Sequence, residues 1–211
     1  DGKALGQHDN LQSTGLQTEF LQYQKKGETI KWTNQFFGGS PMNLIQNQSV
    51  NYTIKTWQFA SLFQPYSNPW ISLFVIMLFS YIALVLLGVD WVVSIVLSLV
   101  LGFFTANTLF INAGHTGKMH VLATAPLLLA SLIYAYKRNI LLGASIFALT
   151  LGVNLMKNHV QMTYYTFLGM LFFGAYFLYD AVQQKKLAHF AQFVAAMLVA
   201  TLLGVGSNAG F

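Results

Sequence analysis

A succession of long apolar runs, which starts at Pro69, constrains the fold of this chain more than any other sequence feature. Each run is long enough to cross a bilayer, which takes roughly 17–25 residues of helix. Only helices and closed barrels satisfy every backbone group in lipid, and continuous apolar runs of this length indicate helices. The connections are short, so neighbouring helices are expected to be antiparallel. Six spans are predicted, near residues 69–88, 91–111, 117–136, 139–156, 160–179 and 188–206.

The composition also favours a membrane protein. Of the 211 residues, 55% are hydrophobic and 8% are charged, whereas an ordinary soluble domain has roughly 45–50% and 25%. The formal charge of +5 comes from cations scattered between apolar runs. A nucleic-acid partner is therefore not expected, because such partners need cations gathered on one face. The chain has no cysteine, which excludes disulfides, thiolate metal sites and cysteine nucleophiles.

The polarity of the sequence changes at Pro69 and divides it into two parts. Residues 1–68 are mostly polar and are predicted to form an extracytoplasmic segment of helix and loop. Residues 69–211 are predicted to form an all-α, polytopic transmembrane helix bundle. Membrane lipid is accordingly the first expected partner.

An amphipathic helix is expected within the polar segment. Asp9 or Asn10 is suited to its N-cap, and lysines in the last turn before Gly27 indicate an end at Lys26. Its apolar stripe, which runs through Phe20, is expected to lie on the membrane surface or against the bundle.

Cations beside short loops predict the orientation of the bundle, because such loops are biased toward the cytoplasm. Lys137–Arg138 and Lys185–Lys186 lie in two short connections that six alternating spans place on one side. That side is predicted to be cytoplasmic, so residues 1–68 lie outside. Asp90 and Asp180 fall at the cytoplasmic ends, where solvated turns explain them.

Polar and ionisable side chains collect at the helix ends that this orientation places outside. His115 and Lys118 open the third span, Lys157 and His159 lie between the fourth and fifth, and Gln161 opens the fifth. Groups of this kind usually face a bundle interior or a wet cavity. With few carboxylates nearby, they suit an anion such as a lipid-linked phosphate or pyrophosphate. The alternative is that the lysines snorkel to headgroups and the histidines merely sit at the interface.

A carboxylate to act with this cation set has to come from the polar segment, where Asp9 is the best candidate. Beside His8 and just before a helix, its carboxylate is suited to accept a proton from an incoming hydroxyl. The alternative is that Asp9 only caps the helix, in which case Glu19 and Glu28 are the next candidates. Metal-ligand spacing is absent from the sequence, so no cofactor is assigned and a divalent-metal requirement stays open.

Four sequence elements, in order along nearly the whole chain, resemble the bacterial YfhO-type membrane proteins of the GT-C glycosyltransferase superfamily. These elements are Gly6–Asp9, Trp32–Pro41, Ala113–Lys118 with Pro126 in the following span, and His159–Tyr165. The chain departs from the expected pattern at Gly117, where a larger polar residue is expected.

This resemblance implies an integral enzyme of the bacterial cytoplasmic membrane with its active face outside the cytoplasm. Such an enzyme takes a sugar from a polyprenyl-phosphate donor and passes it to a glycan, lipid or polymer acceptor. In this superfamily an acidic residue of the first outer loop is the expected catalytic carboxylate, and Asp9 occupies that place. The resemblance also implies that the sequence is a fragment, without the first transmembrane helix and a large carboxy-terminal part.

Two other functions stay open. A transporter or lipid flippase is the main alternative, although transporters tend to hold their substrates at the midplane on broken helices. Here the polar groups lie near an interface, and Pro126 is the only mid-span proline after Pro69. A non-catalytic assembly subunit would explain weak catalytic motifs but not the one-sided polar cluster.

Overall fold

The computed structural model describes residues 15–28, 30–35, 38–41, 69–155 and 159–208. In these ranges the chain forms eight helices and two short strands, so the predicted helical bundle is confirmed. The amino-terminal elements are α2 (Thr18–Lys25), β1 (Trp32–Thr33) and β2 (Ser40–Pro41). The bundle helices are α5 (Pro69–Leu86), α6 (Trp91–Gly102), α7 (Thr105–Ala113), α8 (Thr116–Lys137), α9 (Ile140–Leu155), α10 (Val160–Gln183) and α11 (Leu187–Gly206).

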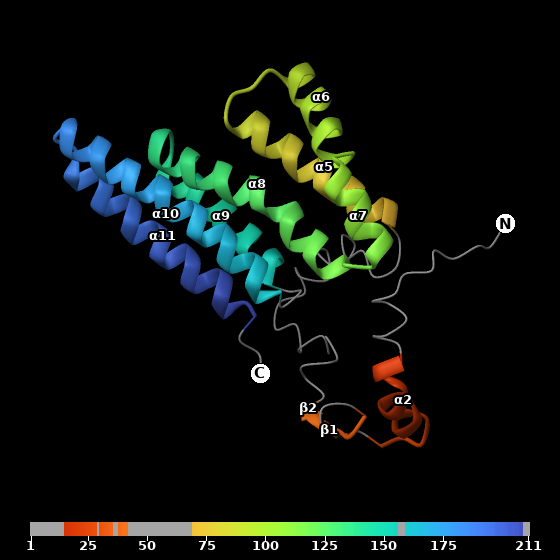
Figure 1. The fold of residues 1–211 in the computed structure, drawn as a ribbon. Coiled ribbons are helices and arrows are strands. Elements are labelled where there is room, and N and C mark those ends of the chain that lie inside the picture. The colour runs from red at the N-terminus through yellow and green to blue at the C-terminus, as the bar shows by residue number, and fades with distance from the viewer. Residues whose placement is uncertain (1–14, 29, 36–37, 42–68, 156–158, 209–211) are drawn as a thin grey trace.

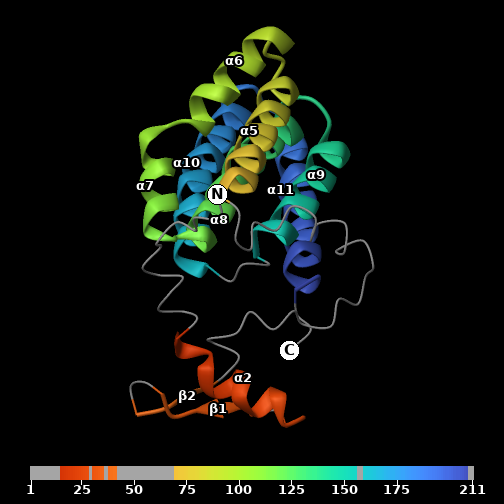
Figure 2. The ribbon, with the colours of Figure 1, turned by 90° about the vertical axis from the view of Figure 1, so that its right-hand side faces the viewer.

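Helix α8 is the centre of the bundle. It lies between α9, α10 and α11 on one side and α5 on the other, and α6 packs on α5 (Figures 1 and 2). Of the most apolar part of α8, 67% is buried, against 17% for α10 and 22% for α11. The two outer helices therefore present broad apolar surfaces, as helices that face lipid do.

Two groups of buried side chains hold the helices together. Aromatic rings of Tyr136, Phe147, Phe177 and Phe193 form the centre of the cluster between α8, α9, α10 and α11. Smaller clusters of aliphatic side chains join α5 and α7 to α8. The core thus reaches from end to end of α8, which explains why this helix is the most buried.

Small residues allow α8 and α9 to approach closely. A Cβ placed on Gly143 would lie 2.5 Å from the backbone nitrogen and Cα of Ala135. Only glycine fits at that distance, since the obstacle is backbone and not a flexible side chain. Close contact between small residues is a common way for helices to pack where lipid removes the hydrophobic driving force.

Three helices are long and apolar enough to cross a membrane, in Gly117–Lys137, Val160–Gln183 and Leu187–Gly206. The apolar helices Ile71–Leu86 and Ile140–Leu155 are shorter. Their bounds agree with the predicted runs to within a few residues, but the described part of the chain does not contain six full-length spans.

The predicted span at 91–111 is not one straight helix. It is divided into α6 and α7, which meet at an angle of 42°. Across this break the side-chain amide of Asn107 donates to the carbonyl oxygens of Leu101 and Gly102, at 2.8 and 3.0 Å. The buried amide thus satisfies the carbonyl groups that the end of α6 leaves without helical partners.

Helix α2 and the two strands form a small separate unit (Figures 1 and 2). The Glu19 carboxylate accepts hydrogen bonds from the hydroxyl of Thr33 and the backbone N–H of Asn34, which ties the helix to the hairpin. Trp32 pairs with Pro41, so the Trp32–Pro41 motif forms a short antiparallel hairpin.

The predicted end of the amino-terminal helix is confirmed, but its predicted start is not tested. Helix α2 ends at Lys25, followed by Gly27 in a left-handed conformation with φ of 78°. Phe20 is buried, as expected for the apolar stripe. Asp9 and Asn10 lie outside the described residues.

Candidate functional site

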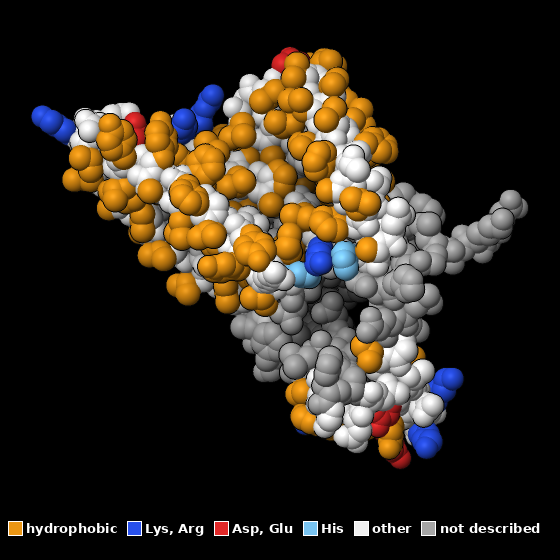
Figure 3. Space-filling view, in the orientation of Figure 1, with side chains coloured by type: hydrophobic (Ala, Val, Ile, Leu, Met, Phe, Trp, Pro, Cys, Tyr) orange, Lys and Arg blue, Asp and Glu red, His pale blue; other side chains and the backbone are white. Residues whose placement is uncertain are grey.

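The first turns of α8 and α10 meet at one end of the bundle, which we call the His159 end. A Cβ placed on Gly117 would lie 3.6 Å from Cδ2 of His159. His115 and His159 are the N-cap residues of α8 and α10, and neither side chain accepts a hydrogen bond from its own helix. At this end of the helical body a lysine or arginine side chain lies between two histidines on the surface (Figure 3).

The electrostatics of the His159 end favour an anion. Each helix begins with backbone N–H groups that have no helical partner, and the helix dipole adds a partial positive charge there. Lys118, half-buried in the first turn of α8, adds a full positive charge at a position where helices usually carry Asp or Glu. Two helix starts and a lysine together form a surface suited to a phosphate group.

Beneath this surface, buried side-chain hydrogen bonds join three helices. Asn154, near the end of α9, donates to the hydroxyl of Thr124 on α8 at 2.7 Å. Thr163 on α10 donates to the side-chain oxygen of Asn154, also at 2.7 Å. Asn154 is fully buried, with 0% of its surface exposed. These bonds set how α8, α9 and α10 meet and hence where His159 lies.

Two histidines line the same region. Nε2 of His120 lies 3.0 Å from the carbonyl oxygen of Val153, and because a carbonyl only accepts, this nitrogen carries the hydrogen. Nδ1 of His159 is buried and has no hydrogen-bond partner among the described residues. Buried polar atoms are rarely left unpaired, so a ligand or water is the expected partner of this nitrogen.

Of the predicted site residues, His115 and Lys118 lie at the start of α8, and His159 lies at the start of α10 against Gly117. Gln161 does not join them by any described contact, because its side chain is exposed and donates to the hydroxyl of Tyr165 at 2.9 Å. Lys157 and Asp9 lie outside the described residues. Their predicted roles stay predictions.

The buried hydrogen bonds of Asn154 with Thr124 and Thr163 were not predicted from the sequence. The spacing of these residues does not indicate that they meet, because they lie on three different helices. In the structure α9 ends at Leu155 and α10 starts at Val160. Thr163 is instead the buried partner, two residues beyond Gln161.

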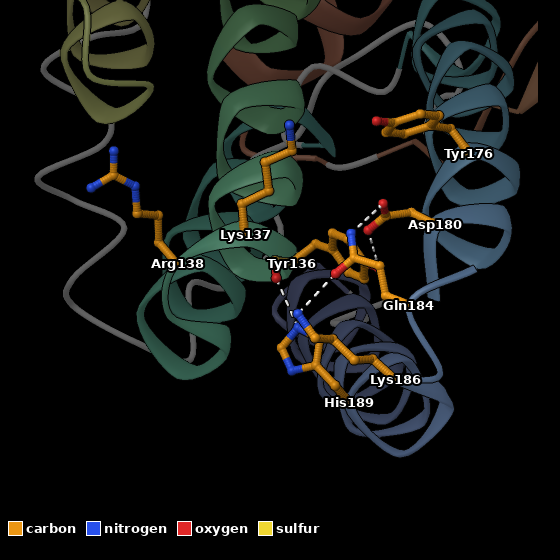
Figure 4. Close-up of a pocket in the computed structure, with 8 residues that line it drawn as sticks. All are labelled: Tyr136, Lys137, Arg138, Tyr176, Asp180, Gln184, Lys186 and His189. Atoms are coloured by element: carbon orange, nitrogen blue, oxygen red, sulfur yellow. Dashed lines mark hydrogen bonds between the residues drawn. The ribbon is translucent and has the colours of Figure 1, made fainter. Parts of the chain in front are cut away.

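At the opposite end of the bundle, which we call the Tyr136 end, α8, α10 and α11 surround a pocket of about 670 Å³ (Figure 4). Lys137 and Lys186, from the two predicted cytoplasmic connections, both line it. The prediction that these connections lie at the same end of the bundle is therefore confirmed. The complete lining consists of Tyr136, Lys137, Arg138, Tyr176, Asp180, Gln184, Lys186 and His189.

Tyr136 holds the wall of this pocket together. Its hydroxyl lies 3.0 Å from a carboxylate oxygen of Asp180, and its ring stacks on Phe177 with centroids 4.3 Å apart. Nε2 of His189 donates to the carbonyl oxygen of Tyr136 at 2.8 Å. One residue near the end of α8 thus contacts both α10 and α11.

Asp90 and Asp180, both predicted to lie in cytoplasmic turns, differ in their surroundings. Asp90 caps α6 and accepts from the backbone N–H of Val92 at 2.9 Å, as expected for a turn residue. The same interpretation of Asp180 is wrong, because Asp180 lies within α10 and accepts hydrogen bonds from Tyr136 and Gln184. No local sequence pattern indicates this contact, since Tyr136 is 44 residues away.

Carboxylates and histidines do not gather as metal ligands in the part of the chain that the structure describes. Glu19, a second candidate for the catalytic base, has its carboxylate bound to the hairpin. Its described role is structural.

Comparison of the chain with protein families, curated proteins and solved structures finds no match. The resemblance to YfhO-type proteins therefore depends on its motifs alone. Of these, Trp32–Pro41 begins and ends with the paired strands β1 and β2, and Ala113–Lys118 spans the junction of α7 and α8.

Proposed function

We propose that this chain is part of an integral-membrane glycosyltransferase, in which the His159 end binds the phosphate of a polyprenyl-phosphate sugar donor. The observation that supports this most directly is the contact between Gly117 and His159, which joins the starts of α8 and α10. Lys118, in the first turn of α8, adds a positive charge, and Nδ1 of His159 adds a buried polar atom with no hydrogen-bond partner among the described residues. The acceptor in this proposal is a glycan, a lipid or a polymer.

The proposed chemistry is a single displacement. The acceptor hydroxyl attacks the anomeric carbon of the donor, the bond from that carbon to the lipid phosphate breaks, and Asp9 accepts the hydroxyl proton. Lys118 and His115, with Lys157 and His159 as further candidates, stabilise the negative charge on the departing phosphate. Gln161 is kept as a contact to the sugar or phosphate at the rim of the site.

The proposed setting is the bacterial cytoplasmic membrane, with the His159 end outside the cytoplasm. Six passes through the membrane follow if α6 and α7 count as one bent span and the shorter α5 and α9 also cross. Lys137 and Lys186 then face the cytoplasm, as short-loop cations prefer. Residues 1–68 lie on the same side as the site.

Binding of a polyprenyl phosphate to the protein in lipid nanodiscs tests this proposal. Replacing Lys118 by Ala removes a charge-assisted contact worth about 1.5–3 kcal/mol, so Kd is expected to rise roughly tenfold to a hundredfold. Lys185→Gln, an exposed cation at the other end of the bundle that lines no described pocket, is the matched control and should leave Kd unchanged. The uncharged polyprenol should bind much more weakly than its phosphate. Equal affinity for both lipids, or no effect of Lys118→Ala, would contradict the proposal.

One observation favours the second candidate, a transporter or lipid flippase. The 42° break between α6 and α7 is the kind of discontinuous span on which transporters build substrate sites. Reconstituted vesicles distinguish the two functions. Movement of a fluorescent lipid across the bilayer without a sugar donor supports transport, whereas donor-dependent glycosylation without lipid movement supports the transferase.

A further inference from the structure

We propose that the pocket at the Tyr136 end binds the phosphate headgroup of an anionic phospholipid. This site is separate from the His159 end and does not depend on glycosyl transfer there. Three cations line the pocket, Lys137, Arg138 and Lys186, against a single carboxylate. The pocket therefore carries a net positive charge between two helix ends and the start of a third.

The single carboxylate does not neutralise these cations. Both oxygens of Asp180 already accept hydrogen bonds, from Tyr136 at 3.0 Å and from Gln184 at 2.7 Å. Lys186 donates to the side-chain oxygen of Gln184 at 2.8 Å, so it is held at the rim by a neutral group. Asp180 is thus held in the wall of the pocket by neutral donors, and its one negative charge leaves the three cations of the lining in excess.

The side chains of Lys137 and Arg138 have no ion-pair or hydrogen-bond partner among the residues that the structure describes. Lys137 rises from the end of α8 beside the pocket, whereas Arg138 extends away from α10 (Figure 4), with Nη2 3.7 Å from a Cβ built on Gly88. An exposed ammonium group and an exposed guanidinium are both suited to phosphate oxygens, and Arg can bind two oxygens at once. Basic pockets between membrane helices are known to hold anionic headgroups.

The surface around the pocket favours a lipid over a soluble phosphate compound. Apolar and aromatic side chains on α10 and α11 continue outward from the pocket with large exposed fractions: Tyr176 53%, Tyr179 62%, Val182 53% and Leu187 54%. Acyl chains can lie along such a surface while the phosphate occupies the pocket. Tyrosine at this level is also typical of the membrane interface.

Binding of a headgroup in this pocket differs from the ordinary snorkelling of lysine side chains to headgroups. A snorkelling cation needs only a flexible stem beside lipid. Here the floor is fixed by Tyr136, which stacks on Phe177 and packs edge-on against Phe193 with centroids 5.4 Å apart. His189 fixes the same residue from α11. A rigid floor in a pocket lined by cations predicts selectivity among headgroups, whereas snorkelling predicts only attraction by charge.

Retention of lipid by the purified protein tests the proposal. Native mass spectrometry after exchange with phosphatidylglycerol or phosphatidylcholine reports how many lipids of each kind stay bound. We expect phosphatidylglycerol to be retained by the wild type, and the double variant Lys137→Gln/Arg138→Gln to bind it about tenfold to thirtyfold more weakly. Both side chains are exposed and lack partners in the described structure, so the variant should fold, which circular dichroism checks.

Lys185→Gln is the matched control for charge. Lys185 is exposed in the same connection as Lys186 but does not line the pocket, so this variant should retain phosphatidylglycerol as the wild type does. An equal loss in Lys185→Gln, or equal retention of phosphatidylcholine, would overturn the proposal in favour of unspecific attraction. Glycerol phosphate and inorganic phosphate, tested by thermal shift, distinguish the source. Stabilisation by either compound equal to that by phosphatidylglycerol would show that the site serves a soluble anion and not a lipid.

Discussion

The hydroxyl of Thr163 donates a hydrogen bond of 2.7 Å to the side-chain oxygen of Asn154, across the junction of α9 and α10. Asn154 in turn donates to Thr124, so one buried amide joins three helices. Since His159 lies one turn before Thr163, this bond positions the start of α10 against α8. The geometry of the proposed phosphate site thus depends on side chains that do not reach the ligand.

Replacing Thr163 by Val should destabilise the bundle by about 1 kcal/mol, because it leaves the buried oxygen of Asn154 without its donor. Thr201→Val is the matched control. The Thr201 hydroxyl donates only to Met197 of its own helix, at 2.8 Å, so its loss should cost much less. Reversible unfolding in mixed micelles measures both values. Equal losses of stability would show that the hydrogen bond between Thr163 and Asn154 stabilises the bundle no more than a hydrogen bond within one helix does.

The contact between Gly117 and His159 predicts a specific cross-link. The chain has no cysteine of its own, so introduced pairs can be read without background. Gly117→Cys with His159→Cys should be joined by a short bismaleimide cross-linker, since a Cβ on Gly117 lies 3.6 Å from Cδ2 of the His159 ring and therefore close to the His159 Cβ. Gly117→Cys with Gln161→Cys is the control, and its exposed position should give far less product. A reversed order of yields would mean that α8 and α10 begin in a different arrangement.

Gly143 should not tolerate a side chain. A Cβ at this position meets the backbone of Ala135 at 2.5 Å, so Gly143→Ala is expected to push α8 and α9 apart and cost about 1–3 kcal/mol. Gly169→Ala is the control, because no atom lies within 4 Å of a Cβ built there. That change should be neutral or stabilising by up to about 1 kcal/mol, through helix propensity. Thermal unfolding in detergent compares them, and an unchanged Tm for Gly143→Ala would contradict the close packing.

The break between α6 and α7 should depend on Asn107. Replacement by Leu, which has a similar size, leaves the carbonyl groups of Leu101 and Gly102 without their side-chain donor. Faster hydrogen exchange is expected at the amides around the break, together with a loss of about 1–2 kcal/mol in stability. Thr108→Val is the control on the same helix, because its exposed hydroxyl donates only to Thr105. If the amides around the break exchange hydrogen at the same rate in both variants, a contact other than the Asn107 side chain maintains the bend.

Several boundaries of the bundle were predictable from the sequence. The run predicted at 117–136 corresponds to Thr116–Lys137, and that at 188–206 to Leu187–Gly206. In both cases a continuous apolar run ends at cations or glycine, so composition alone marks where lipid contact stops. The bend at 91–111 was not predictable in this way. The residues at the break are apolar, and a buried amide later in the chain satisfies the interrupted backbone.

The candidate sites likewise combine features that the sequence predicts with features that it does not. Sequence alone determined that polar groups collect at the helix ends and that Lys137 and Lys186 share one end, because hydropathy and the alternation of spans follow from the linear order. Only the tertiary structure decided that Thr163 turns inward while Gln161 turns outward. It likewise decided that Tyr136 meets Asp180 and His189, which are 44 and 53 residues away. The physical reason is that helix rotation is set by packing against neighbours, and nearly uniform apolar helices carry too little periodicity to specify it.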